Sequence, residues 1–274
     1  MENPEQRILA VVVAYHPQAS LLKRNIDAFR DYVDKIIIWQ NSSVDHSLFE
    51  GIDYTDKIIF VNKGTNVGIS RALNYAFEYA LNNGYDYLLT MDQDSVWVDF
   101  RRFKEFVVSK NKHEVCIIGP AIIYDFGDIE KIDRTNCILD EWVITSGMLI
   151  QASLIQKLGE YNEFFAVDGI DIDFCLRAKE IGISSYQASA GALVQQFGTT
   201  IRKYGLNIRF YNDKRLESII KNHIILLKKY KSKGILREFV EALKNGFLSI
   251  MFLSNKKKLF TAFCRGIFSG IKYC

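Results

Sequence analysis

Two carboxylates, Asp92 and Asp94, stand one residue apart after the apolar run 87–91. A short apolar run bounded by polar residues predicts a buried strand, and α/β enzymes bind ligands where such strands end. Side chains two residues apart point the same way on an extended chain. Because paired carboxylates repel each other, we expect a hard divalent cation there, and such a cation commonly holds phosphate oxygens. The alternative is an acidic loop exposed to solvent.

The elements expected to position these carboxylates alternate between strands and helices. Apolar runs predict strands at 8–15, 35–39, 57–61, 87–91, 115–124 and 142–151, the last of them interrupted at 146–147. Apolar residues at helical spacing predict helices at 20–29, 67–81, 171–180 and 206–230. This alternation predicts an α/β fold with a mostly parallel sheet and right-handed crossovers.

Composition narrows the class of protein. With 274 residues, of which 49% are hydrophobic and 13% aromatic, the chain has enough apolar surface for a substantial core. Its net charge of +3 is too small to indicate a nucleic-acid partner. Five scattered cysteines without a CxxC pair are typical of reduced thiols in the cytoplasm. The polar start carries no signal-peptide pattern, and no apolar run is long enough to span a bilayer.

The chain becomes basic and aromatic from about residue 228. Lysines and arginines alternate with apolar clusters, which predicts basic amphipathic helices over residues 231–274. Such helices suit the surface of an anionic membrane. The same pattern also fits a homodimer interface or a helical layer packed on the main domain. We therefore expect a nucleotide-binding domain at 1–230 followed by a helical tail at 231–274.

A series of short motifs resembles glycosyltransferase family 2 in the order in which they occur. They are VVVAYHP at 11–17, QNSS at 40–43, NVGISRALN at 66–74, DQDS at 92–95, TSG at 145–147 and DGIDIDFCLR at 168–177. The last three are similar to the rhamnosyltransferase branch of that family. The resemblance covers about residues 8–230. It implies a GT-A fold, which is a Rossmann-like, mostly parallel sheet flanked by helices, here with a C-terminal helical extension. It also implies a nucleotide-sugar donor and inversion at the anomeric carbon.

The resemblance also implies roles for individual residues. Asp94 is expected to bind the metal directly with Asp92 beside it, and Asp171 is expected to act as the catalytic base. The residues predicted to hold the donor nucleotide are Ala14, Tyr15, Gln40, Asn41, Asn66, Gly68, Arg71, Asp92 and Gln93. Those predicted to line the acceptor and sugar pocket are Trp142, Ser146, Gly147, Asp168 and Asp173. For Asp168, Asp171 and Asp173, the alternative is acidic charge that matches a helix N-terminus. Asp173 and Arg177 are expected to pair, four residues apart on one helix face.

The chain departs from the family pattern at several positions. Gln40 stands where aspartate is usual, Asp173 replaces glutamate and Phe174 replaces tryptophan. Gln196 stands where many relatives have a histidine that serves as a further metal ligand. Because an amide is a poorer ligand, the expected Mg²⁺ or Mn²⁺ would depend on carboxylates, phosphates and water.

Together these features predict an inverting glycosyltransferase at the cytoplasmic face of the cell membrane. It would move rhamnose from dTDP-rhamnose to a lipid-linked saccharide during bacterial cell-surface polysaccharide synthesis. UDP-galactofuranose and UDP-hexoses are alternative donors. A nucleotidyltransferase is an alternative of another class, but it would need a glycine-rich basic loop after the first strand, where the chain has YHPQ at 15–18. The third alternative is a non-catalytic module that binds a nucleotide sugar.

Overall fold

The computed structural model describes residues 6–50, 56–112, 114–123, 133–165, 167–195, 200–203, 206–209 and 211–273, with only the backbone described for 200–203 and 206–209. Its contacts divide the chain into two compact units, 1–196 and 197–274.

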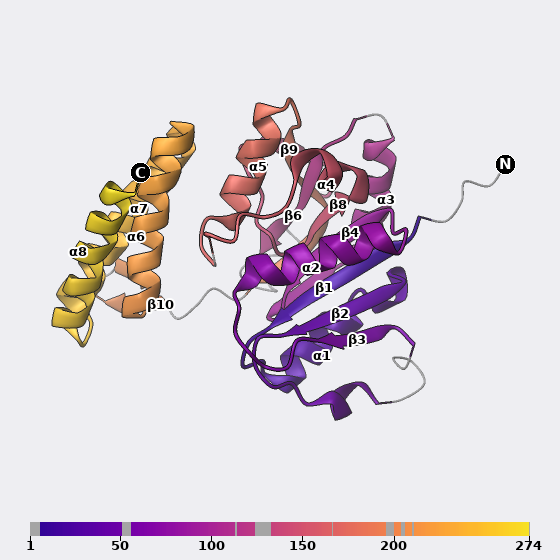
Figure 1. Cartoon of the computed structure of the whole chain (residues 1–274), viewed down its shortest axis with the longest axis horizontal. Helices are drawn as coiled ribbons and strands as arrows, with labels where there is room; N and C mark the ends of the chain where they lie inside the picture. Colours follow the sequence, from indigo (N-terminus) through magenta and orange to yellow (C-terminus); the bar gives the residue numbers. More distant parts are fainter. Residues whose placement is uncertain are drawn as a thin grey trace. The chain divides into compact units, whose positions relative to one another are not determined.

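The first unit is built on a mixed sheet (Figure 1). Four neighbouring strands are parallel, in the order β3 (Ile58–Val61), β2 (Lys35–Gln40), β1 (Ile8–Ala14) and β4 (Tyr87–Asp92). The sheet continues through β8 (Met148–Gln151), β6 (Ile117–Ile123), β9 (Ser185–Gln195) and β5 (Ser95–Val98), while β7 (Cys137–Asp140) also pairs with β9. Of these later pairings only β6 with β9 is parallel. Every residue of β1 is buried, as expected of a parallel strand covered on both faces.

Helices flank this sheet. They are α1 (Ala19–Asp27), α2 (Ile69–Asn82), α3 (Phe100–Asn111), α4 (Ala152–Leu158) and α5 (Ile170–Glu180), with short 3₁₀ turns at Arg30–Tyr32 and His46–Phe49. Figure 1 shows α2 lying across β1 and β4. Its buried face carries apolar residues at helical spacing, among them Leu73, Ala76 and Phe77. The helix predicted at 67–81 begins at Ile69 because Gly68, with a φ of 87°, precedes it in a conformation that breaks helical geometry.

Two predicted elements are shorter than expected. The strand predicted at 142–151 is reduced to β8, because Gly147 turns the chain with a φ of +82°. The helix predicted at 206–230 begins only at Asp213, where the Asn212 side chain caps it by accepting a hydrogen bond from the Arg215 N–H at 2.8 Å. Leu206–Arg209 instead forms strand β11, which pairs antiparallel with β10 (Thr200–Lys203). This strand pairing outweighs the helical spacing that Leu206 and Ile208 share with the residues after them.

The second unit contains that hairpin and three helices, α6 (Asp213–Tyr230), α7 (Lys233–Phe252) and α8 (Lys256–Lys272). Buried Leu216, Ile220 and Leu259 form its core. Gly266 lets α6 and α8 approach closely, since a Cβ there would lie 2.8 Å from the Glu217 carbonyl oxygen. We expected a domain boundary near residue 230, which is the end of α6. In the structure α6 packs against both later helices, and the contacts divide the chain after residue 196. Among the helices that the structure describes, none combines the length and apolarity needed to cross a bilayer.

Candidate active site

The DxD motif lies at the carboxyl end of the parallel strands. Asp92 is the last residue of β4 and is paired with Val13 of β1. Gln93 and Asp94 form a turn, and β5 starts directly afterwards at Ser95. The expectation that both carboxylates lie on one extended strand is therefore wrong, because the chain turns between them. Both side chains are partly exposed at this edge of the sheet.

Gln93 connects this turn to the end of β1. Its Oε1 accepts a hydrogen bond from the Tyr15 N–H at 2.6 Å, and its Nε2 donates to the Tyr15 carbonyl oxygen at 3.0 Å. Gln93 was predicted to hold the donor, but in this structure its amide braces the backbone. Tyr15 keeps an exposed ring beside the predicted nucleotide site.

Asp92 is held through both its backbone and its carboxylate. Its N–H donates to Ser146 Oγ at 3.1 Å, and its carbonyl oxygen accepts from Asn25 Nδ2 at 2.8 Å. Its Oδ2 accepts from Gln195 Nε2 at 3.3 Å. The sequence had given no sign of the roles of Asn25 and Gln195, because both lie far from Asp92 along the chain.

Two residues predicted for the sugar pocket support the end of β4. Ser146 is 1% exposed, and its Oγ donates to Ser95 Oγ at 3.0 Å. A Cβ on Gly147 would lie 2.7 Å from Pro120 Cγ and 3.1 Å from the Trp97 ring, so only glycine fits there. Trp142, the aromatic residue predicted for the same pocket, is half-buried.

Gln40 is the last residue of β2 and Asn41 comes directly after it. Both residues are buried. Gln40 Nε2 donates to the Asn62 carbonyl oxygen at 3.0 Å, and Gln40 Oε1 lies 3.0 Å from His46 Nε2. These contacts connect the Gln40 amide to the loop that follows β3 and to the 3₁₀ turn His46–Phe49.

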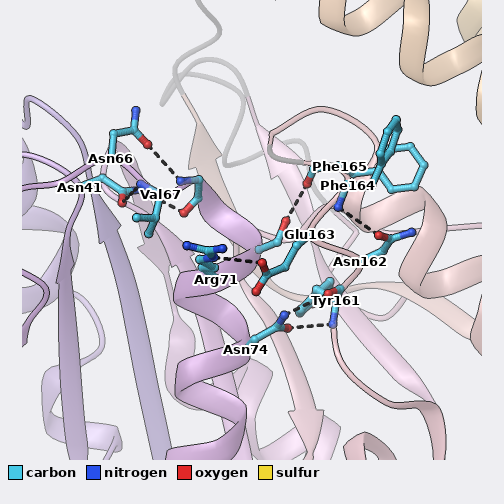
Figure 2. Close-up of polar contacts among 12 residues, drawn as sticks. Asn41, Asn66, Val67, Arg71, Asn74, Tyr161, Asn162, Glu163, Phe164 and Phe165 are labelled. Atoms are coloured by element: carbon cyan, nitrogen blue, oxygen red, sulfur yellow. Dashed lines mark hydrogen bonds and ion pairs between the residues drawn. The ribbon is translucent and has the colours of Figure 1, made fainter. Parts of the chain in front are cut away.

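Asn41 links the strand ends to the start of α2. Its N–H donates to the Ala14 carbonyl oxygen at 2.8 Å. Its Oδ1 accepts from the Val67 N–H and its Nδ2 donates to the Gly68 carbonyl oxygen, both at 3.1 Å (Figure 2). Asn66 Oδ1 in turn accepts from the Gly68 N–H at 3.1 Å. Three predicted donor-binding segments, at the ends of β1 and β2 and before α2, are therefore in direct contact.

A pocket of about 540 Å³ opens at the N-terminus of α2. Its lining residues are Asn66, Val67, Gly68, Ser70, Arg71, Glu163 and Val167. Backbone N–H groups at a helix N-terminus and a guanidinium both favour an anion such as a phosphate. The pocket therefore brings together the predicted donor residues Asn66, Gly68 and Arg71.

Arg71 is paired across the pocket with Glu163, a residue that the sequence had not indicated. Arg71 Nε lies 2.9 Å from Glu163 Oε2, and the two side chains are 59% and 47% exposed. Figure 2 shows them pointing toward each other from α2 and from the segment that precedes α5. Because an exposed ion pair stabilises a fold by less than about 1 kcal/mol, the guanidinium can exchange Glu163 for a ligand phosphate at small cost.

The second acidic group occupies the start of α5, as predicted. Asp171 lies in the first turn, partly exposed, and its Oδ1 accepts from the Ile172 N–H at 2.9 Å. Asp168 is partly buried directly after Val167 of the pocket wall. The predicted pairing of Asp173 with Arg177 is confirmed at 3.0 Å. Asp173 is only 1% exposed, so its side chain points into the protein body and not toward an open pocket.

Asp92 and Asp94 fit a hard divalent cation, because carboxylate oxygens are the ligands that Mg²⁺ and Mn²⁺ prefer. Within the described residues, no three or more His, Cys, Asp or Glu side chains are grouped as a metal site. Protein ligands alone would therefore be few, and donor phosphates and water would complete the shell. The prediction for Gln196 lies outside the described residues.

The fold and the site define a class, that of GT-A enzymes that use nucleotide sugars. The family model described as Glycosyl transferase family 2 matches residues 10–171, and the chain belongs to this family. The predicted family and GT-A fold are thus confirmed, and the protein is a glycosyltransferase.

Relatives and solved structures agree with this class. The chain is 24% identical over 269 residues to the dTDP-rhamnosyl transferase RfbF of Shigella flexneri, with 91% of this chain and 90% of that protein covered. It is similar in fold to GalNAc-T7 with UDP, GalNAc and Mn²⁺ (TM-score 0.63, 12% identity), covering 99% of this chain and 57% of that one. It is also similar to the mannosyltransferase PcManGT of Pyrobaculum calidifontis with GDP-Man and Mn²⁺ (TM-score 0.56, 15% identity), covering 98% and 76%.

Proposed function

We propose that the chain is an inverting glycosyltransferase that moves rhamnose from dTDP-rhamnose to a lipid-linked saccharide in bacterial cell-surface polysaccharide synthesis. The observation that carries the proposal is the DxD turn after β4, which belongs to the same sheet edge as the pocket at the start of α2. The choice of donor is supported by the Shigella flexneri relative, whose name specifies dTDP-rhamnose, and by the DQDS motif. UDP-galactofuranose and UDP-hexoses remain the alternative donors.

In this proposal the donor binds along the carboxyl edge of β1, β2 and β4. Ala14, Tyr15 and Asn41 face the nucleoside, and Arg71 and the backbone at Gly68 meet the diphosphate. Asp94 and Asp92 would hold a divalent cation, which would neutralise charge on the departing diphosphate.

Asp171 supplies the base. As the acceptor hydroxyl oxygen attacks the anomeric carbon, its proton passes to the Asp171 carboxylate. The new glycosidic bond forms on one face of the sugar while the bond to the diphosphate oxygen breaks on the other. A single displacement of this kind inverts the anomeric configuration.

The proposal is tested by incubating the protein with dTDP-rhamnose, UDP-galactofuranose and UDP-hexoses and a short saccharide acceptor. Release of dTDP only from dTDP-rhamnose, with a product whose anomeric configuration by NMR is opposite to that of the donor, is the expected result. Release from another donor would replace rhamnose, and retained configuration would contradict the single displacement. A nucleotidyltransferase would release no dTDP in this assay, and would form pyrophosphate only when given a nucleoside triphosphate and a sugar 1-phosphate.

We further propose that the second unit brings the enzyme to an anionic membrane surface. Residues 228–274 carry eleven lysines and arginines and two glutamates, a net charge of +9, which leaves −6 for the rest of the chain. Apolar side chains are exposed on one face of α7 (Leu236, Val240, Phe247 and Met251) and on one face of α8 (Phe260, Phe268 and Ile271). Basic helices with an exposed apolar face suit a peripheral position on the inner leaflet. A homodimer interface is the alternative use of these faces.

A further inference from the structure

Asn74 closes the 66–74 motif, yet its side chain does not line the pocket. It is 7% exposed on α2. Its Nδ2 donates to the Tyr161 carbonyl oxygen at 3.0 Å, and its Oδ1 accepts from the Tyr161 N–H at 2.8 Å (Figure 2). One buried amide thus satisfies both backbone groups of a residue 87 positions away. A contact of this kind fixes where the partner backbone lies.

Two more residues of α2 contact the same segment. Ser70, which is 2% exposed, donates from Oγ to the Phe165 carbonyl oxygen at 2.6 Å, and Arg71 pairs with Glu163. The partners of Ser70, Arg71 and Asn74 are residues 165, 163 and 161, in reverse order. The segment 161–165 therefore runs antiparallel to the first turns of α2, as Figure 2 shows.

The same segment is fastened to α5 on its other side. The Tyr161 ring stacks on Phe174 of α5, with ring centroids 4.2 Å apart. Arg177 of α5 donates to the Leu158 carbonyl oxygen at 2.9 Å and to the Glu160 carbonyl oxygen at 2.7 Å. Residues 158–165 thus connect the two helices, and the chain then leads through Asp168 into the first turn of α5.

We propose that Asn74 and Ser70 are positioning residues that set the location of Asp171 relative to the donor. The N-terminus of α2 forms the donor pocket, and the hydrogen bonds from Asn74 and Ser70 connect this helix to the segment that leads into α5. This inference rests on the proposed role of Asp171 as base. Because a shift of about 1 Å in a reacting group can reduce the rate about 10²-fold, a loosened segment is expected to slow the chemical step more than donor binding.

The test uses the full chain with Asn74→Ala and Ser70→Ala. Asn82→Ala is the matched control, because Asn82 is an exposed asparagine near the other end of the same helix. Values of kcat and of KM for the donor are measured well below the melting temperature of each variant. Asn74→Ala is expected to lower kcat about 10- to 10²-fold, with the donor KM changed less than about threefold and the control unchanged. Ser70→Ala removes one hydrogen bond, so it is expected to lower kcat in the same way but by a smaller factor.

A double-mutant cycle with Asp171→Asn separates positioning from general destabilisation. If Asn74 acts through Asp171, then Asn74→Ala causes less than about a twofold further loss when Asp171 is already replaced. An equal loss of kcat in both backgrounds would overturn the proposal, as would a lowered melting temperature with unchanged kcat. Should Asn74→Ala fail to fold, the same cycle with Ser70→Ala decides. Failure of the proposed function would look different, because the parent protein would then release no nucleotide from any donor.

Discussion

Asp92 and Asp94 lie in different local structures, the end of β4 and the turn after it, although they share one motif. The Asp92 carboxylate accepts a hydrogen bond from Gln195, and its backbone is fixed by Ser146 and Asn25. Asp94 lies in the turn and is partly exposed. We propose that Asp94 is the direct metal ligand and that Asp92 supports the site beside it.

Replacing Asp94 tests that division. Asp94→Ala is expected to weaken donor binding at least about tenfold and to remove stimulation by Mn²⁺ or Mg²⁺, because the cation loses a charged ligand. Calorimetric titration of donor with and without EDTA measures both effects. Asp27→Ala, which removes an exposed carboxylate on α1, is the control. The metal hypothesis fails if EDTA does not affect the parent and the variant binds donor normally.

Asp171→Asn is expected to reduce kcat at least about 10²-fold while donor affinity stays within about twofold. The amide keeps the shape of the side chain but cannot accept the proton of the acceptor hydroxyl. Single-turnover rates and donor titration give the two quantities. Asp173→Asn is a useful comparison because it removes the negative charge that pairs with Arg177 in a buried position, so its main effect should be lower thermal stability. Near-normal turnover by Asp171→Asn would remove the residue from the role of base.

The buried cysteines should be inert. Burial raises the pKa of the Cys116 and Cys175 thiols to about 12. Both therefore stay protonated below that pH, and at pH 8 only about 10⁻⁴ of each is the reactive thiolate. Iodoacetamide at pH 8, followed by mass spectrometry, should label exposed Cys264 in the native protein and reach Cys116 and Cys175 only after unfolding. Rapid native labelling of Cys175 would show that α5 opens readily.

How much of the site could be predicted from the sequence depends on how local each contact is. Asp173 and Arg177 are four residues apart on one helix, so their pairing followed from helical spacing. The contact of Gln93 with Tyr15 spans 78 positions, and that of Asp92 with Ser146 spans 54. Local patterns cannot show such contacts. For this reason the sequence motifs indicated ligand-binding roles for Gln93 and Ser146 but not the hydrogen bonds by which both also brace the strand ends.

The boundaries of strands and helices are set by a few residues with special backbone conformations. Gly147 sets the start of β8 through its positive φ and its close packing against Pro120. The strand predicted at 142–151 was expected to be interrupted at 146–147, and the part after this interruption, Met148–Gln151, forms β8. The parallel strands β1, β2 and β4 were predicted more accurately, since each is largely buried and pairs with a strand on both sides.

Gly147→Ala is expected to lower the free energy of unfolding by about 2–5 kcal/mol. The positive φ costs an alanine about 1–2 kcal/mol, and overpacking adds about 1–3 kcal/mol. Gly159→Ala is a matched control, because Gly159 has a similar φ of +78° but nothing within 4 Å of the added Cβ. Urea unfolding compares the two variants. If both variants lose the same free energy of unfolding, then only the positive φ, and not the packing against Pro120, explains the need for glycine at position 147.

At the scale of the whole molecule, charge is divided unevenly along the chain. The segment 228–274 has a net charge of +9 and the remainder −6. Because α7 and α8 bury the core face of α6, deleting them would expose Leu216 and Ile220. Substitution of exposed side chains is therefore a cleaner test of membrane binding than truncation.

The intact protein is expected to float with anionic vesicles at low salt, and high salt should weaken this binding through screening. Replacing Phe247, Phe260 and Phe268 together by serine should release it while leaving the melting temperature within a few degrees, because all three rings are exposed. Flotation and light scattering are measured side by side. If the intact protein does not float, the membrane proposal fails. If light scattering shows that the triple variant has half the mass of the intact protein, these faces form a dimer interface.

The most direct test of the central claim is nucleotide release from dTDP-rhamnose in the presence of acceptor, compared between the parent chain and Asp171→Asn. We expect acceptor-dependent release of dTDP by the parent and at least about a 10²-fold slower rate for the variant, which still binds donor. The proposed function is wrong if no nucleotide sugar yields free nucleotide, and Asp171 is not the base if the variant transfers sugar at the parental rate.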